Sequence, residues 1–147
     1  MSEFFIKYTD TNTVIPRKEL HSAAFLIALD GEKILAIKND RGWEIPGGQI
    51  DKGETQEEAL IREVKEAAGG SFSDAKLLAI IESSNQGIYK DKVMFVYATK
   101  HFKLGEFTPS EDAFEREIID INEFLQRHKG TINFTELISR AKDLINM

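Results

Sequence analysis

The stretch 48–70 constrains the fold of this chain more than any other part of the sequence. It opens on a Pro-Gly-Gly run at 46–48, where proline fixes φ and glycine frees it, so the segment before it must end in a tight bend. Thr55 and Glu58 have the spacing of a capping box, which predicts a helix beginning near Thr55. Two adjacent glycines at 69–70 predict its end.

The predicted helix has an apolar stripe and a charged face. The stripe consists of Leu60, Ile61, Val64 and Ala68, and we expect it to pack on the core. The charged face carries Arg62, Glu63 and Glu66, and the two glutamates are one turn apart, so their carboxylates can converge on one ion. In an arbitrary helix such a face is more often simply solvated. The spacing of the whole stretch therefore decides between the two interpretations.

The spacing of glycines and charges through 48–70 resembles the sequence box of the Nudix hydrolases, G-x5-E-x7-R-E-U-x-E-E-x-G-U, in which U is a bulky aliphatic residue. The matching positions are Gly48, Glu54, Arg62, Glu63, Glu66 and Gly69. Agreement at this spacing is far more specific than a lone glycine motif. The resemblance extends over roughly residues 21–128 and implies the family's α/β/α sandwich around a mixed sheet.

Two positions depart from this box. Gly70 replaces an aliphatic residue, and Ala67 replaces the second glutamate of the Glu-Glu pair, which in the family is usually a direct metal ligand. Because Ala67 is predicted to lie off the apolar stripe, we expect a glutamate introduced there to add a ligand without disturbing the packing of the helix. Two interpretations stay open: a working hydrolase, and a Nudix-fold module that binds a nucleotide or a partner without turning it over.

The resemblance implies a reaction and a set of roles. Nudix hydrolases typically cleave a diphosphate linkage in a nucleoside diphosphate derivative with water and Mg²⁺ or Mn²⁺, ions that hard oxygen ligands suit. By position, Glu63 is implied to be a metal ligand or general base and Glu66 a metal ligand, while the carbonyl of Gly48 can reach the metal. Arg62 is implied to orient the glutamates by ion pairing.

A further metal ligand in this family often comes from a later loop. The candidate carboxylates there are Glu111, Asp112 and Glu115, of which Glu111 is preferred. The substrate is less well specified, and a nucleoside triphosphate or a related small nucleotide is expected. Possible base or phosphate contacts are Arg41, Tyr89 and Phe95, each of which core or surface packing explains equally well.

Composition limits the classes of function. The 147 residues, 41% of them hydrophobic, suffice for one domain over 1–147 with a sizeable core. A net charge of −6 argues against a protein that binds the backbone of a nucleic-acid polymer. There are no cysteines, which excludes disulfides and thiolate metal sites, and the three histidines show no spacing typical of metal ligands.

The rest of the chain predicts strands on both sides of the helix. Strands are expected at 4–8, 23–29, 33–38, 77–82, 93–99 and 118–121, and further helices at 122–128 and from Asn133 onward. An Asp-Gly turn at 30–31 joins two of these strands into a hairpin. This order indicates a mixed α/β domain. The sequence shows no cationic leader and no apolar span of about 18 residues, so we expect a cytoplasmic protein with no membrane partner.

Overall fold

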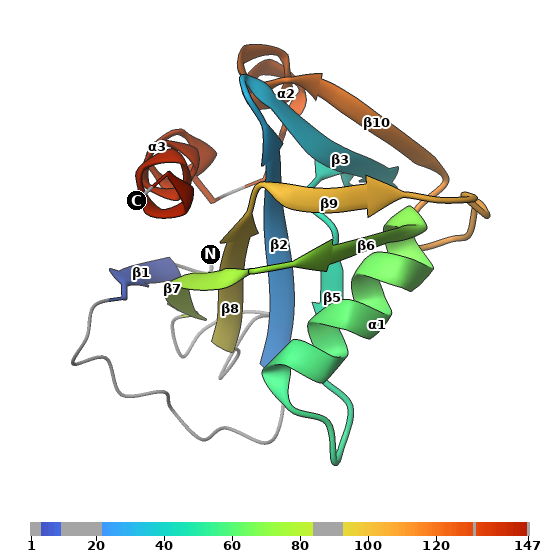
Figure 1. Ribbon diagram of the computed structural model, residues 1–147, viewed down its shortest axis with the longest axis horizontal. Helices are drawn as coiled ribbons and strands as arrows, with labels where there is room; N and C mark the ends of the chain where they lie inside the picture. Colours follow the sequence, from blue (N-terminus) through green and yellow to red (C-terminus); the bar gives the residue numbers. More distant parts are fainter. Residues whose placement is uncertain (1–3, 10–21, 84–92, 131, 147) are drawn as a thin grey trace.

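A computed structural model describes residues 4–9, 22–83, 93–130 and 132–146 of the chain (Figure 1). Its strands are β1 (Phe4–Tyr8), β2 (Ser22–Asp30), β3 (Lys33–Asn39), β4 (Gly42–Glu44), β5 (Gly47–Gln49), β6 (Gly70–Ser73), β7 (Lys76–Ser83), β8 (Val93–Thr99), β9 (His101–Leu104) and β10 (Glu115–Asp120). Its helices are α1 (Gln56–Ala68), α2 (Ile121–Arg127) and α3 (Phe134–Ile145). Within these described residues no helix is long and apolar enough to cross a bilayer.

A mixed sheet forms the centre of the molecule. Its strands follow the order β1-β7-β8-β2-β3-β10, and off this path β5 pairs with β2 and β4 with β3. β2 and β8 run parallel, with Ser22 opposite Val93, and the other pairs of this sheet are antiparallel. A separate two-stranded sheet joins β6 to β9. Parallel neighbours need a crossover connection. Here that connection is long, because all of β3 to β7 comes between β2 and β8 in the sequence.

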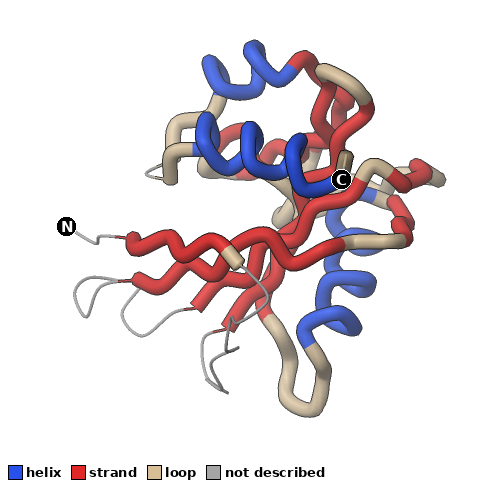
Figure 2. The backbone as a smooth tube through the Cα atoms, turned by 60° about the vertical axis from the view of Figure 1, so that its left-hand side comes forward, coloured by secondary structure: helices blue, strands red, loops and turns tan. Residues whose placement is uncertain are grey.

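Helices cover both faces of the central sheet, as Figure 2 shows. On one face α1 packs through Leu60 and Val64 in a cluster that includes Phe95 of β8. On the other face α2 and α3 share a second cluster with the sheet, in which Phe124 and Leu137 are fully buried. These two separate apolar clusters confirm the predicted α/β/α sandwich around a mixed sheet.

The predicted helix after the glycine turn forms where the sequence places it. The Thr55 side chain accepts a hydrogen bond from the Glu58 amide (3.1 Å), and the Glu58 carboxylate accepts one from the Thr55 amide (2.9 Å), so the capping box is confirmed. Gly69 ends the helix with a φ of 63°. The Tyr97 hydroxyl of β8 donates to Gln56 Oε1 (3.1 Å), which ties the start of α1 to the sheet.

The buried face of α1 differs from the stripe that the sequence predicted. The buried residues are Ala59, Leu60, Val64, Ala67 and Ala68. Leu60, Val64 and Ala67 recur at i, i+4 and i+7 and centre this face. Ile61 lies about 100° round the helix from Leu60 and is 57% exposed, so its assignment to the packed stripe is wrong. Ala67 is only 6% exposed, and the prediction that it lies off the packed face is also wrong.

Elsewhere the predicted strands and helices are confirmed to within a few residues. The largest shift is at β10, which begins at Glu115, three residues before the predicted start at 118. Four short strands, β4, β5, β6 and β9, were not predicted. Each is three or four residues long. β5, β6 and β9 pair with strands that are distant in the sequence, which no local pattern reveals, whereas β4 forms a tight hairpin with β3.

Candidate active site

The turn before α1 holds β5 tightly against β2. Gly47 pairs with Phe25 and Gly48 with Ala24. Gly47 has a φ of 155°, and a Cβ there would lie 2.3 Å from the carbonyl oxygen of Ala24, so no side chain fits between these strands. Gly48 faces α1, where a Cβ would lie 2.4 Å from Glu63 Oε2. The bare backbone of Gly48 therefore leaves the space that the Glu63 carboxylate fills.

Arg62 lies at the centre of a cluster of carboxylates. Its Nε donates to Glu54 Oε2 (2.8 Å) and its Nη2 to Glu54 Oε1 (2.9 Å), which makes a bidentate pair. Its Nη1 donates to Glu63 Oε1 (2.8 Å) and to Glu66 Oε2 (3.2 Å). Its Nη2 also donates to the carbonyl oxygen of Gln49 (3.0 Å). The guanidinium thus joins the loop after β5 to the charged face of α1.

Glu54 is fully engaged by this arginine. The hydrogen bonds from Arg62 lower the pKa of Glu54 from 4.5 to about 2, and a hydrogen bond from the Asp51 amide (2.9 Å) acts in the same direction. The contacts with Glu54 and Glu63 in turn raise the pKa of Arg62. Since both oxygens of Glu54 accept hydrogen bonds from Arg62, this carboxylate anchors the loop to the helix.

Glu63 has a different electrostatic environment. Burial raises the pKa of its carboxyl group, the hydrogen bond and charge of Arg62 lower it, and the charges of Glu66 and Asp112 raise it, so that the net shift is upward. Oε1 accepts the hydrogen bond from Arg62, whereas Oε2 faces Gly48. One oxygen is thus fixed by the arginine, and the other is directed toward the glycine turn.

The loop before β10 carries the three acids that the sequence offered as a further ligand. Glu111, Asp112 and Glu115 are all exposed, and Glu115 pairs with Lys38 (3.5 Å). The charge of Asp112 makes the smallest of the contributions that shift the pKa of Glu63. Glu111 as the loop ligand therefore stays a prediction.

Backbone contacts hold the loop that carries Asp112. Ala113 is fully buried, its carbonyl oxygen accepts from the Ser110 amide (2.9 Å), and its own amide donates to Ser110 Oγ (3.3 Å). The Phe114 amide donates to the carbonyl oxygen of Lys38 in β3 (2.9 Å). A small apolar residue inside an acidic loop is the one sequence signal for this anchoring.

Of the three residues predicted to contact the substrate, the structure describes Arg41 and Phe95. Arg41 is exposed in the turn between β3 and β4, where its Nε lies 3.4 Å from Glu44 Oε1. Phe95 is 2% exposed in the cluster beneath α1, which makes it a core residue. Tyr89 lies outside the described residues.

The carboxylates around Arg62 are not arranged as a finished metal centre. In the part of the chain that the structure describes, no three His, Cys, Asp or Glu side chains form a group that could hold a metal ion. Arg62 instead engages the carboxylates of Glu63 and Glu66. Ala67 supplies no oxygen and packs in the apolar cluster beneath α1. Arg62 thus occupies Oε1 of Glu63 and Oε2 of Glu66, one oxygen of each glutamate.

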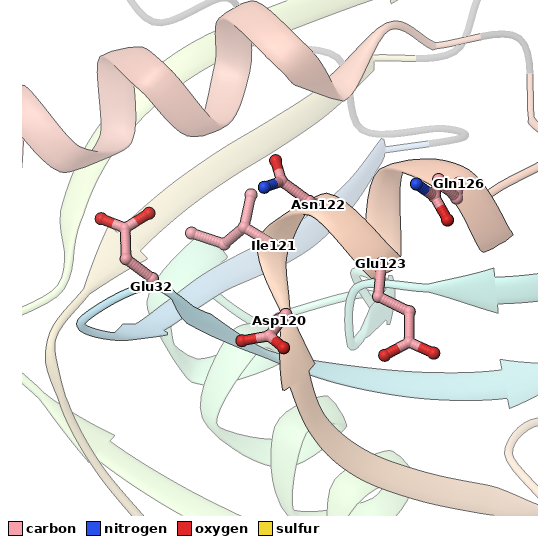
Figure 3. Close-up of a pocket in the computed structure, with 6 residues that line it drawn as sticks. All are labelled: Glu32, Asp120, Ile121, Asn122, Glu123 and Gln126. Atoms are coloured by element: carbon pink, nitrogen blue, oxygen red, sulfur yellow. The ribbon is translucent and has the colours of Figure 1, made fainter.

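A pocket of about 400 Å³ is separate from this cluster (Figure 3). Its lining consists of Glu32, Asp120, Ile121, Asn122, Glu123 and Gln126, from the β2–β3 turn, the end of β10 and α2. Two of its acids are engaged in ion pairs, Glu32 with Lys142 (2.7 Å) and Glu123 with Arg127. No residue of the box stretch lines it, so it does not belong to the candidate site.

Comparison with known proteins decides the family. The NUDIX domain family model matches residues 19–140. The chain belongs to the Nudix family. The family that the 48–70 stretch predicted is thereby confirmed, and in this Nudix domain Glu54, Glu63 and Glu66 of that stretch meet at Arg62.

Two curated relatives show which Nudix proteins the chain is similar to. It is 33% identical over 116 residues to the ADP-ribose pyrophosphatase of Methanocaldococcus jannaschii, a match that covers 72% of this chain and 66% of that protein. It is 29% identical over 104 residues to the 8-oxo-dGTP diphosphatase of Proteus vulgaris, which covers 67% of this chain and 82% of that protein. The chain thus spans just under two thirds of the first relative's length.

Solved structures agree on the fold. The chain is similar to the Bacillus subtilis pyrophosphohydrolase BsRppH in its E68A form, with a TM-score of 0.72 and 25% identity over 96% of this chain and 89% of that one. It is also similar to a MutT Nudix hydrolase from Burkholderia pseudomallei, with a TM-score of 0.63 and 20% identity over 83% of this chain and 95% of that one.

Proposed function

We propose that this Nudix domain hydrolyses a diphosphate linkage in a nucleoside triphosphate or another nucleoside diphosphate derivative, with Mg²⁺ or Mn²⁺. The observation that carries the proposal is the meeting of Glu63 and Glu66 at Arg62, beside the bare backbone of Gly48. Two relatives whose names describe cleavage of diphosphate linkages, in ADP-ribose and in 8-oxo-dGTP, support the same class of reaction.

The chemistry of the box glutamates suits a divalent cation. Its side-chain donors would be carboxylate oxygens of Glu63 and Glu66, with Glu111 as the predicted loop ligand, and such oxygens are the hard ligands that Mg²⁺ and Mn²⁺ prefer. Burial, and to a smaller extent the charges of Glu66 and Asp112, raise the pKa of Glu63, and Arg62 offsets only part of this shift, so further positive charge beside this carboxylate would be favourable. When bound, such a cation would offset the charge of the substrate phosphates and promote ionisation of the attacking water.

The protein residues have separate tasks in this proposal. Arg62 fixes Oε1 of Glu63 and, through Glu54, the loop that follows Gly48. Oε2 of Glu63 is left to bind the cation or to accept a proton from water. A carboxyl group whose pKa is raised is a stronger base than an ordinary one, which suits the second role.

The test measures hydrolysis of a panel of nucleotides that includes nucleoside triphosphates, ADP-ribose and 8-oxo-dGTP. Release of phosphate or diphosphate is the quantity measured. Excess chelator should abolish turnover. Glu63→Gln keeps the shape of the side chain but removes its charge, and we expect kcat to fall at least about a hundredfold with the fold retained. Glu57→Gln, a charge removal on the exposed first turn of the same helix, is the matched control and should leave kcat nearly unchanged.

A second function is supported by one observation, the buried alanine at a position where the Nudix box has a glutamate. In this alternative the domain binds a nucleotide without turning it over. Ligand-induced shifts in Tm on the same panel separate the two functions. Shifts without product release would favour the binding module, whereas metal-dependent release that Glu63→Gln suppresses would favour the hydrolase. Turnover that persists in chelator, with metal removal verified, would rule out the proposed mechanism.

A further inference from the structure

The strand β1 forms one end of the central sheet (Figure 1). Among the described residues its only neighbouring strand is β7, to which it is antiparallel, with Ile6 opposite Ile81. The end of β1 is attached to β7, because the Thr9 amide donates to the carbonyl oxygen of Leu78 (3.0 Å) and Thr9 Oγ1 donates to that of Leu77 (2.6 Å). The sheet therefore holds β1 as an edge strand.

The hydrogen bond of Thr9 shows which backbone groups of β1 point toward β7. In an antiparallel pair, opposite residues alternate between hydrogen-bonded and non-hydrogen-bonded positions. Because Thr9 continues the register of β1 and bonds to β7, the amide and carbonyl groups of Lys7 and Phe5 also point toward β7. The groups that point away belong to the alternate residues, which are Phe4, Ile6 and Tyr8. These are the groups with which a further strand could pair.

The exposed side chains beside this edge are an aromatic ring and two opposite charges. Phe5 is 59% exposed, and Lys7 is exposed on the same face of β1. Glu82 of β7 lies opposite Phe5 and is exposed as well. Ile6 points to the other face, where it packs against the apolar cluster beneath α2 and α3.

The opposite end of the sheet has a different character. β10 carries three exposed acids, Glu115, Glu117 and Asp120. Charged side chains protect an edge strand from pairing with another chain. β1 contains no acid and a single lysine. Pairing between two copies of the chain is therefore opposed at β10 much more than at β1.

Symmetry and charge select one register for two copies of β1. A two-fold axis at Lys7 would place two ammonium groups opposite each other, which is unfavourable. An axis at Phe5 would engage only residues 4–6 of each copy. An axis at Ile6 engages the whole strand, places the outward-facing backbone groups of the two copies opposite each other, and places Phe5 opposite Lys7 of the partner subunit.

The charges in this register are complementary. Neighbouring strands lie about 4.8 Å apart, so the backbone of Lys7 of the partner subunit would be one strand spacing from Phe5 and two, about 10 Å, from Glu82. A lysine stem can lie along an apolar ring while its ammonium group reaches an acid beyond it. The two-fold axis repeats this row of lysine, phenylalanine and glutamate on the other side of the interface.

We propose that β1 is an interface between two copies of this chain, which pair as antiparallel strands about Ile6 and join their central sheets. The inference does not depend on the proposed function. Because only five residues of each strand pair, the interface is at the small end of specific interfaces, and dimer formation is reversible and depends on concentration.

The experiment is sedimentation equilibrium of the full chain over a concentration series up to about 1 mM, at which even a weak complex is populated. Phe5→Lys places like charges opposite each other twice in the dimer, while within one chain the new ammonium group faces Glu82, so the fold is retained. Ile61→Lys is the matched control, because Ile61 is 57% exposed on α1, far from β1 in the sequence and on another element.

We expect the unmodified chain to shift from monomer to dimer as its concentration rises. Phe5→Lys should raise the dimer Kd at least about tenfold, because two favourable cross-strand pairs are replaced by two repulsive ones. Ile61→Lys should leave the Kd within about twofold. Lys7→Glu alone should also weaken the dimer, because it places a carboxylate near Glu82, whereas Phe5→Lys combined with Lys7→Glu should restore it by pairing opposite charges.

Hydrogen exchange of single amides tests the alternation along β1. The amides of Ile6 and Tyr8 should exchange more slowly as the dimer forms, because they gain acceptors from the partner subunit. Those of Phe5 and Lys7, which already point toward β7, should change less. Equal slowing at all four positions would contradict the proposed pairing.

The outcomes of the sedimentation experiment are separable. A chain that stays monomeric over the whole series would overturn the proposal and leave Lys7 as a residue that keeps the edge unpaired. A dimer that Phe5→Lys weakens no more than Ile61→Lys would place the interface elsewhere. Failure of the double variant to recover dimer formation would exclude the register about Ile6, and with it the proposed interface.

Discussion

Replacement of Ala67 by glutamate tests the main departure of this chain from the Nudix box. Ala67 is 6% exposed and packs in the cluster beneath α1. A longer side chain in such a site costs about 1–3 kcal/mol, and a carboxylate four residues from Glu63 adds desolvation and like charge. We expect the free energy of unfolding in chelator to fall by about 3 kcal/mol. For a domain of this size, that lowers Tm by about 6–12 °C.

Ile61→Glu is the matched control for this change. It adds the same charge to the same helix, but Ile61 is 57% exposed, so the free energy of unfolding should change by no more than about 0.5 kcal/mol. Thermal and urea unfolding of both variants in chelator measures the difference. An Ala67→Glu protein as stable as the Ile61→Glu protein would refute the reasoning, because it would mean that position 67 tolerates a carboxylate as a surface site does.

Added Mn²⁺ gives the second half of this test. A ligand at about 100 times its Kd raises the free energy of unfolding by about 2.7 kcal/mol if it binds only the folded state. If the carboxylate at 67 joins Glu63 in binding the ion, Mn²⁺ should raise the Tm of Ala67→Glu more than that of the unmodified chain. An equal rise in both proteins would show that position 67 takes no part in binding.

Two further outcomes follow from the contacts of the box residues. Gly48→Ala places a methyl group 2.4 Å from Glu63 Oε2. Because the flexible end of Glu63 can move away, we expect the free energy of unfolding to change by less than about 1 kcal/mol. The Mn²⁺ affinity, measured by calorimetry, should fall at least about tenfold. Unchanged affinity would mean that the Glu63 position is not critical. Glu54 has a folded pKa of about 2, below its usual 4.5, so the stability it contributes is present above pH 4.5 and lost as the pH falls toward 2. Arg62→Met should return the pKa of Glu54 toward 4.5 in an NMR titration, and a pKa still near 2 would exclude Arg62 as the cause.

Local sequence signals predicted local structure well. Thr55 and Glu58 lie within one helical turn, so their spacing alone indicated the start of α1, and the box spacing indicated that Arg62, Glu63 and Glu66 would meet. The exposed Ile61 was assigned to the core because a short helix allows more than one apolar stripe, and only the neighbouring strands choose between them.

Contacts between distant segments could not be predicted in this way. Ala113 is buried inside an otherwise exposed acidic loop, and its hydrogen bonds with Ser110 anchor that loop. The hydrogen bond from Arg116 to Ala68 joins residues 48 positions apart. No spacing rule within one segment contains such information, because it depends on how the loop after β9 packs against the end of α1.

The parallel pairing of β2 and β8 has a consequence for the order in which the molecule is built. Ser22 lies opposite Val93, and the entire box is encoded between these strands. During synthesis, Gly48 and α1 leave the ribosome well before β8, so the surface on which α1 packs is still incomplete. Closing so long a connection carries a large entropic cost, and such pairings form slowly. A nascent chain stalled before residue 93 should therefore contain every box residue and still lack the assembled site.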